Sequence, residues 1–342
     1  MLTLAFPLLF SFSTVLFHSD SPSPSPQCHQ NSTNSTLLFA YSNDLDSDLV
    51  LNSAQAITTW LRNYNHEKDF ATYASVRLDY NNGTHILYNN NSVGFWNSLI
   101  YKLPEPWHSY PEGYGSDILD VLQTFLSSSI NLCKATIILL LKRNTNSTLV
   151  PIPLVQSLQK NHVFIWSMMS DQPSGGIHFK PVYDMVSRSN GFAMFSNDSM
   201  FVQSLYWGFD SIWTTSGFLY SQNLALTGHG STELDPITIP SETMISGSVL
   251  VYLTVQEYAF PKVFQSFTFT FIDEGLQKNE TLTVGAKDLL HQSTAIFTFK
   301  WLEFSEKYRV ILDYGYLGNG TQQVEVRMFV NGTLYEWPGF DN

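Results

Sequence analysis

The feature that most restricts the fold is a regular alternation of short apolar runs and amphipathic stretches between residues 37 and 210. The most apolar run of this region, ATIILLLK (135–142), is typical of a central parallel strand that is covered on both faces. LLFAY (37–41) and HVFIWSMM (162–169) have the same character. The stretch that follows Asp46 instead repeats its apolar residues with a helical period. Alternation of this length predicts a doubly wound α/β sheet.

Two strands of this sheet are expected to run antiparallel to each other. FATYASVRL (70–78) and THILYN (84–89) are both β-rich, and Asn82-Gly83 lies between them. Asn-Gly between two such runs is the strongest short-range signal for a β-hairpin. With GFAMF (191–195) as the last strand, the sequence predicts a mostly parallel six-stranded sheet with one antiparallel edge hairpin.

A second pattern begins at about residue 216 and predicts an all-β antiparallel sandwich over 216–342. QSFTFTFID (265–273) places Phe at every second position, as in a strand with one buried face. Turn chemistry at Asn319-Gly320 and Asn331-Gly332 predicts tight hairpins. Seven strands are expected, at 247–255, 265–273, 280–284, 294–301, 308–314, 322–330 and 333–337.

The strand TAIFTFKW (294–301) carries a second aromatic row, made of Phe297, Phe299 and Trp301. An aromatic row of this kind is compatible with carbohydrate binding. Because aromatic residues at a strict period of two more often line a core, we interpret the row as part of the sandwich core.

The N-terminus indicates the compartment. Residues 1–17 contain no charged side chain and are too short and interrupted to span a bilayer comfortably, so we expect a signal peptide over 1–20. A linker rich in Ser, Pro and Asn follows at 21–36. No apolar stretch of spanning length occurs after residue 17, so the mature chain is expected to have no membrane span and to be secreted.

The surface of the mature chain is expected to be glycosylated. Only 13% of the residues are charged, so another group must solvate the surface. Seventeen Lys and Arg against 29 Asp and Glu give a net charge of −12, which argues against binding to nucleic acid. Nine N-x-S/T sequons are present, at Asn31, Asn34, Asn82, Asn90, Asn146, Asn197, Asn279, Asn319 and Asn331.

In its order of elements, the region 37–209 resembles a von Willebrand factor A-type domain, and looks closest to degenerate secreted members. The resemblance rests on six strands with one antiparallel hairpin and on the residues at the strand ends. In metal-binding members of the family, the first strand ends in Asp-x-Ser-x-Ser, a later loop supplies Thr, and the fourth strand ends in Asp. These residues together hold one divalent cation through oxygen ligands.

The sequence departs from that motif at each of these points. The first acidic position is occupied by Tyr41 or Ser42, the Thr loop corresponds to Gly115-Ser116-Asp117, and the fourth strand runs into two cations. We therefore expect neither a metal nor another cofactor. We interpret Asp44 and Asp46 as loop and helix-cap residues rather than a displaced carboxylate cluster. The expected ligand face consists of Ser42, Asn43, Asp44, Asp46, Ser116, Asp117, Lys142 and Arg143.

The resemblance also implies a disulfide. The sequence has two cysteines, Cys28 and Cys133, and in the resembling fold the strands that follow them are parallel neighbours. Both cysteines would then approach the edge of the sheet opposite the ligand face, so we predict that they are bridged; the alternative is a free Cys28 or one paired with another chain. On the chain-entropy model, such a bridge stabilises the domain by about 4–5 kcal/mol.

Signatures of common enzyme classes are absent from the sequence, including His-Glu-x-x-His, Gly-x-Ser-x-Gly, and phosphate-binding or dinucleotide-binding glycine loops. We therefore predict a secreted, non-enzymatic recognition or adhesion module that binds an extracellular protein or glycan independently of divalent metal. The alternative is a metal-dependent hydrolase that uses Asp44 and Asp46, because paired aspartates after an apolar strand occur in enzymes that form an aspartyl-phosphate.

Overall fold

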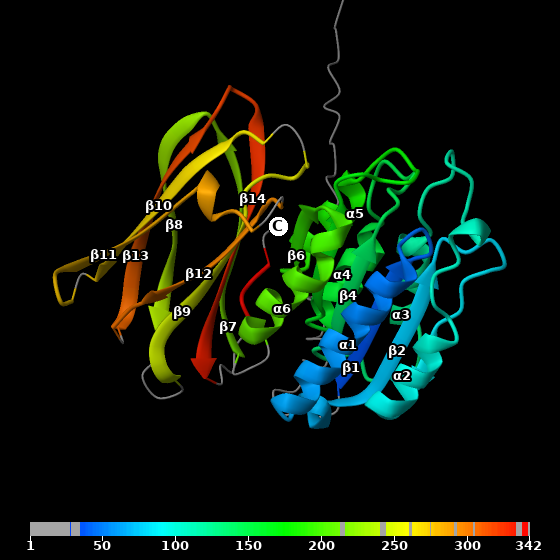
Figure 1. Ribbon diagram of the computed structural model, residues 1–342. Coiled ribbons are helices and arrows are strands. Elements are labelled where there is room, and N and C mark those ends of the chain that lie inside the picture. Colours follow the sequence, from blue (N-terminus) through cyan, green and yellow to red (C-terminus); the bar gives the residue numbers. More distant parts are fainter. Residues whose placement is uncertain are drawn as a thin grey trace, which may run out of the picture.

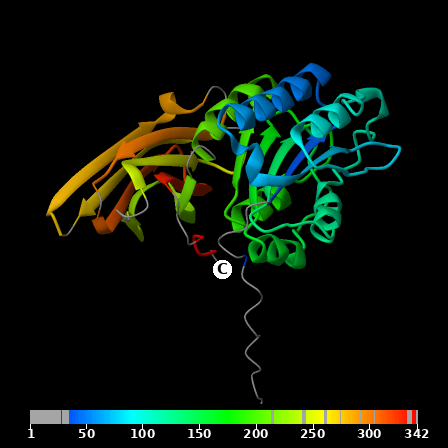
Figure 2. The same cartoon turned by 90° about the horizontal axis from the view of Figure 1, so that it is seen from below.

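The computed structural model describes Cys28 and residues 35–212, 216–239, 244–259, 262–273, 275–290, 293–303, 305–332 and 337–340. The expected signal peptide and most of the linker lie outside these residues. Two domains lie side by side, an α/β domain and a β-sandwich, as Figures 1 and 2 show in two views. An α/β domain followed by an all-β domain is the order expected from the sequence.

The α/β domain is built on one six-stranded sheet with the order β3-β2-β1-β4-β5-β6. All neighbouring strands are parallel except β2 and β3, which are antiparallel. This confirms the predicted sheet and its edge hairpin at Asn82-Gly83. The strands are β1 (Ser35–Ser42), β2 (Phe70–Leu78), β3 (Leu87–Asn89), β4 (Thr136–Leu141), β5 (Phe164–Ser170) and β6 (Phe192–Ser196).

Helices cover both faces of this sheet and bury the side chains of its central strands. One face packs against α1 (Ser47–Asn63), α2 (Ser92–Ile100) and α6 (Phe201–Ile212). The other packs against α3 (Ile118–Leu126), α4 (Ile152–Lys160) and α5 (Lys180–Arg188). Helix α2, which begins after the capping side chain of Asn91, was not predicted; its apolar residues lie on its exposed as well as its buried side and show no clear helical period.

The second domain contains two antiparallel four-stranded sheets, β11-β10-β13-β8 and β12-β9-β14-β7, which confirms the predicted sandwich. The sequence reasoning missed the first two strands, whose polar residues weaken the alternation. The strands are β7 (Ser216–Thr227), β8 (His229–Ile239), β9 (Met244–Thr254), β10 (Phe264–Asp273), β11 (Lys278–Gly285), β12 (Ala295–Trp301), β13 (Ser305–Tyr316) and β14 (Thr321–Gly332).

Two of the predicted turns are corrected by the structure. Asn319-Gly320 connects β13 to β14, but these strands belong to different sheets, so the connection crosses the sandwich and does not form a hairpin. Asn331-Gly332 is the end of β14 rather than a turn, and Asn331 pairs with Ser216 of β7. Of the strand expected at 333–337, residues 333–336 lie outside the described residues, and Trp337 is not in a strand.

The two aromatic rows of this domain have different environments. Phe267, Phe269 and Phe271 are fully buried in the sandwich core, as predicted. The row on β12 points to the outer face of its sheet, so its assignment to the sandwich core was wrong. Phe297 packs against the α/β domain, whereas Phe299 and Trp301 are 57% and 61% exposed.

The outer face of the sheet β12-β9-β14-β7 and the α/β domain share one continuous apolar core. Trp166 of β5 lies 6.0 Å from Tyr252 of β9 and 5.6 Å from Phe297 of β12, measured between ring centroids. Phe164 of β5 similarly contacts Phe329 of β14 at 6.1 Å. A shared core of this kind fixes the relative position of the two domains.

Side chains of the sandwich also satisfy the open edge of the α/β sheet at β6. The Glu325 carboxylate accepts a hydrogen bond from the Ala193 amide at 2.8 Å, and Arg327 Nε donates to the Gly191 carbonyl at 2.7 Å. The Thr294 hydroxyl accepts from the Phe195 amide at 3.0 Å. An uncovered edge strand is a template for association with other strands, and here the second domain covers it.

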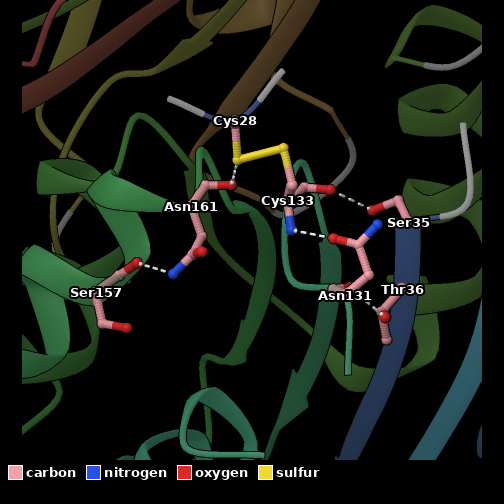
Figure 3. The surroundings of a disulfide bond; sticks show 7 residues. All are labelled: Cys28, Ser35, Thr36, Asn131, Cys133, Ser157 and Asn161. Atoms are coloured by element: carbon pink, nitrogen blue, oxygen red, sulfur yellow. Dashed lines mark hydrogen bonds between the residues drawn. A yellow bond between two sulfur atoms is a disulfide. The ribbon is translucent and has the colours of Figure 1, made fainter. Parts of the chain in front are cut away.

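The predicted disulfide between Cys28 and Cys133 is confirmed, with 5.4 Å between the Cα atoms (Figure 3). Cys133 lies just before β4, and its carbonyl accepts a hydrogen bond from the Ser35 hydroxyl at the start of β1. The Cys28 sulfur lies 3.3 Å from the carbonyl oxygen of Asn161. The bridge therefore connects residues at the amino ends of neighbouring parallel strands.

Candidate functional site

The candidate site lies where the parallel strands end, the usual position of a ligand site in an open α/β sheet. Ser42 is the last residue of β1, and Lys142 and Arg143 directly follow β4. The adjacent strand β2 ends immediately before Asp79. The loop 103–115 approaches the same strand ends and contributes the carbonyl groups described next.

Arg143 is the centre of this arrangement and is only 4% exposed. Its Nε donates to Asp44 Oδ2 at 2.8 Å. Its two terminal nitrogens donate to the carbonyl oxygens of Pro111 at 2.8 Å, Tyr114 at 2.7 Å and Tyr110 at 2.7 Å. Four of the five N–H groups of the guanidinium are thereby satisfied, so the side chain is held in one position.

The partner carboxylate, Asp44, is also largely enclosed. Its side chain is 10% exposed, and Oδ2 accepts a second hydrogen bond, from the Ser174 hydroxyl at 2.5 Å. Two charge-assisted interactions on one carboxylate oxygen form a stronger contact than a surface ion pair. Asp44 is therefore committed to Arg143 and to the loop that follows β5.

The loop that carries Gly175 and Gly176 requires glycine because other groups approach it closely. A Cβ atom at Gly175 would lie 2.3 Å from an Arg143 terminal nitrogen and 2.6 Å from the Glu112 carbonyl oxygen. Gly176 has a φ of +70° and lies against the Asn144 backbone. The absence of side chains lets the loop close over the guanidinium.

Asn43 attaches the loop 103–115 at a second point. Its amide nitrogen donates to the Glu105 carbonyl at 2.7 Å and to the Ser109 hydroxyl at 2.8 Å, and its oxygen accepts from the Glu105 amide at 2.8 Å. The neighbouring Ser42 hydroxyl accepts from the Lys142 amide at 3.1 Å and so connects the ends of β1 and β4. Both side chains are fully buried.

The sequence reasoning did not identify Asp79, a buried acid of this site. Its amide donates to Asp117 Oδ1 at 3.0 Å, and its own Oδ1 accepts from the Asp117 amide at 3.3 Å. Burial, and next the nearby charge of Asp117, raise the pKa of Asp79 to about 7; the hydroxyls of Ser116 and Ser42 act in the opposite direction. The sequence signal that could have identified Asp79 is its position directly after β2, the strand that pairs with β1.

Of the eight predicted ligand-face residues, the structure brings together Ser42, Asn43, Asp44, Ser116, Asp117 and Arg143. Asp46 is separate, because its carboxylate caps α1 by accepting from the Asp48 and Leu49 amides at 2.9 and 3.1 Å. Lys142 points to Asp198 and forms an ion pair with it. The paired aspartates of the hydrolase alternative are therefore engaged in separate structural contacts.

The site is closed at its centre and apolar at its rim. Ser42, Asn43, Ser116 and Arg143 are buried. Trp107 and Tyr114, on the loop anchored by Arg143 and Asn43, are 75% and 61% exposed. Among the described residues, no group of three or more His, Cys, Asp or Glu side chains is placed to hold a metal ion. The arrangement can position a loop, and it holds its charged groups in fixed contacts.

The predicted glycosylation sites lie at various depths. Asn82, Asn90, Asn146, Asn279 and Asn319 are exposed, while Asn197 is half-buried and caps a short helical turn. Asn31 and Asn34 lie outside the described residues. No helix in the described part of the chain is long and apolar enough to cross a membrane.

Known proteins resemble parts of this chain. A family model described as a domain of unknown function (DUF7154) matches residues 222–331, within the sandwich. No curated protein matches the chain. A von Willebrand factor type A structure from Catenulispora acidiphila is similar over 88% of this chain and 59% of its own, with 10% identity and a TM-score of 0.37.

Two further solved structures each resemble one part of the chain. Proximal thread matrix protein 1 from the mussel byssus is similar over 59% of this chain and 51% of its own, with 10% identity and a TM-score of 0.37. A carbohydrate-binding module of Cellvibrio mixtus lichenase 5A, in complex with cellotriose, covers 33% of this chain and 88% of its own, with 16% identity and a TM-score of 0.20. The chain spans between about half and three fifths of the first two structures.

Proposed function

Starting from a first domain with a von Willebrand factor A-like fold, we propose that this chain is a secreted, glycosylated recognition or adhesion module that acts without a divalent metal. It binds an extracellular partner, a protein or a glycan, through the loops at the carboxyl ends of the α/β strands. The observation that carries this proposal is the position of Arg143: the fourth strand of metal-binding members of the resembling family ends in Asp, whereas here it is followed by a buried guanidinium that is paired with Asp44.

Electrostatics supports binding without a metal. Two like unit charges 4 Å apart repel by about 4 kcal/mol at an effective dielectric constant of 20, and a dication doubles this value. The Arg143 guanidinium is fixed at this place; its partner Asp44 offsets part of this repulsion, but that carboxylate is engaged by Arg143 and Ser174 rather than free to bind a cation. The raised pKa of Asp79 leaves that carboxyl partly protonated near neutral pH, which reduces its value as a hard anionic ligand.

The rim of the site supplies a surface suited to a partner. Trp107 and Tyr114 expose large rings on a loop that is anchored at both ends, by Asn43 and by Arg143. Aromatic side chains are enriched at the energetic centres of protein interfaces. An anchored loop also loses less conformational entropy on binding than a free one. The arginine thus holds in place the loop that presents the binding residues.

Calorimetric titration of the purified glycoprotein with Mg²⁺, Mn²⁺ and Ca²⁺ tests the metal-independent part of the proposal. We expect no heat beyond dilution up to millimolar concentrations and the same melting temperature with and without chelator. A cation that raises the melting temperature, with the effect lost in Asp44→Ala but kept in the matched exposed variant Asp48→Ala, would overturn it.

Secretion and glycosylation are tested by expression in a eukaryotic secretory host. We expect the protein in the medium, with an apparent mass that falls by several glycans after treatment with an N-glycosidase. An unshifted band retained in the cytosol would contradict the proposal. No observation favours the hydrolase alternative.

A further inference from the structure

The outer face of the sheet β12-β9-β14-β7 carries an aromatic row that continues beyond the domain interface. Phe297, Phe299 and Trp301 alternate along β12 and therefore share one face, with successive rings about 7 Å apart along the strand. The first ring packs into the shared core, 5.6 Å from both Trp166 and Phe192. The other two rings are more than half exposed. Large exposed aromatic rings next to one another are a marker of a binding surface.

These two rings line an open depression of about 750 Å³ at the end of the sandwich. Its volume lies within the range of ligand-binding clefts in proteins. Charged side chains complete the lining of the depression. The aromatic and charged side chains of the lining are Phe299, Trp301, Lys278, Glu280, Lys300 and Glu303.

The charged groups of the depression form one connected network. Lys278 Nζ lies 2.5 Å from Glu303 Oε1 and 3.3 Å from Glu280 Oε1, and Lys300 Nζ lies 2.9 Å from Glu280 Oε2. The hydrogen bond from Lys300 lowers the pKa of Glu280, and the one to Glu303 raises the pKa of Lys278. Two lysines and two glutamates give the network no net formal charge.

We propose that this depression binds a neutral saccharide chain supplied by another molecule. The faces of aromatic rings carry partial negative charge and attract the weakly positive C–H groups of a sugar ring. The adjacent ammonium and carboxylate groups supply hydrogen-bond donors and acceptors for the hydroxyls on the sugar's edge. An apolar platform with a few placed polar groups is the usual composition of a small-molecule site.

The charge balance distinguishes this ligand from other occupants. Nucleic acid or an acidic polysaccharide requires an excess of cations, and here Glu280 and Glu303 cancel the two lysines. A lipid surface would leave this ion-pair network facing hydrocarbon without hydrogen-bonding partners, at a high desolvation cost. A neutral polyhydroxyl ligand satisfies both the rings and the network.

The test uses the full secreted chain and a panel of soluble neutral hexasaccharides: cellohexaose, xylohexaose, mannohexaose and chitohexaose. We expect at least one to bind in calorimetry, and Trp301→Ala to weaken that binding at least tenfold, with a smaller loss in Phe299→Ala. The matched control is Tyr101→Ala, which removes an aromatic ring that is 84% exposed on the other domain and should leave saccharide binding unchanged. Because both rings are exposed, unchanged melting temperatures should show that the variants fold.

Several outcomes would overturn the proposal. No heat with any hexasaccharide, equal binding by Trp301→Ala and the unmodified protein, or tighter binding of polygalacturonate would each do so. Binding seen only after enzymatic removal of the N-glycans would mean that the chain's own glycan fills the depression. Association with phosphatidylcholine vesicles, or self-association, that is lost in Trp301→Ala while saccharides give no heat would assign the surface to a lipid or a second copy.

Discussion

Arg143 and Arg327 are both buried arginines, at two different places in the molecule. Arg143 lies at the carboxyl ends of the α/β strands, and Arg327 lies between the domains. Both donate mainly to backbone carbonyl groups. They differ in their acids: Arg143 contacts Asp44 at 2.8 Å, whereas Arg327 lies 3.9 Å from Glu325.

This difference separates two uses of a buried guanidinium. Asp44 neutralises Arg143 directly, so that group is a compact ion pair that organises loops. Glu325 instead directs one carboxylate oxygen to the Ala193 amide, and burial raises its pKa to about 7. Arg327 donates to carbonyls of both domains, including Gly191 and Gln222, and therefore acts chiefly as a connection between them.

The largest effect is expected from Arg327→Met. The substitution leaves the carbonyls of Gly191 and Gln222 without their donor in a fully buried interface and removes the cation beside Glu325. We expect a loss of about 3–5 kcal/mol in the free energy of unfolding, measured by urea denaturation. Arg62→Met is the matched control, because its side chain is 65% exposed and its partner Glu67 is 3.8 Å away. The control should lose less than about 0.5 kcal/mol; equal losses would contradict the comparison.

The next effect concerns pH and Glu325. Its folded pKa, raised by burial to about 7, lies above the ordinary value of 4.5. The folded state therefore holds the proton more tightly, and this contribution is fully present below about pH 4.5 and is lost as the pH rises through 7. The loss is on the order of 3 kcal/mol.

Urea denaturation between pH 4.5 and 8 measures this dependence. Glu325→Gln should reduce the fall in the free energy of unfolding between pH 4.5 and 8. Adding Asp79→Asn to that variant should reduce the fall further, because the pKa of Asp79 is also raised to about 7. A pH profile that Glu325→Gln leaves unchanged would show that the interface carboxyl does not titrate in this range.

A smaller loss, about 2–3 kcal/mol, is expected for Arg143→Met, because its site lies nearer the solvent and the loops can relax. The carbonyls of Tyr110, Pro111 and Tyr114 would lose their donor, so limited proteolysis should cut within 103–115. Arg327→Met, examined under conditions where it remains folded, should leave that loop resistant. If both variants expose the loop equally, the two arginines do not have separate structural roles.

The smallest effect is expected for Lys142→Met. Its side chain is 25% exposed, and that of Asp198 is 22% exposed, so water and salt screen the pair. We expect a change of less than about 1 kcal/mol, which shrinks between low and high salt in thermal melts. A loss as large as that of Arg143→Met would mean that Lys142 and Arg143 contribute equally to the stability of the fold.

Prediction from sequence succeeded where a local pattern has one structural solution. The apolar run 135–142 could only be a buried strand or helix, and its length and β-branched residues favoured the strand. It failed where the pattern was weak, as in β7, β8 and α2. In the candidate site, the sequence showed that the acidic ligands of the resembling family are absent. It did not show that Arg143 pairs with Asp44 or that Lys142 pairs with Asp198.

The sequence by itself determined the mostly parallel sheet, its antiparallel edge, the sandwich that follows and the absence of the metal-ligand motif of the resembling family, because these follow from backbone periods and from residue types at strand ends. Only the tertiary structure decided that Glu325 and Arg327 cover the edge of β6, that Asp79 is buried, and that Trp301 faces solvent. A strand's alternation defines two faces, but it does not say which face meets the core, a second domain or water. That choice depends on partners far away in the chain.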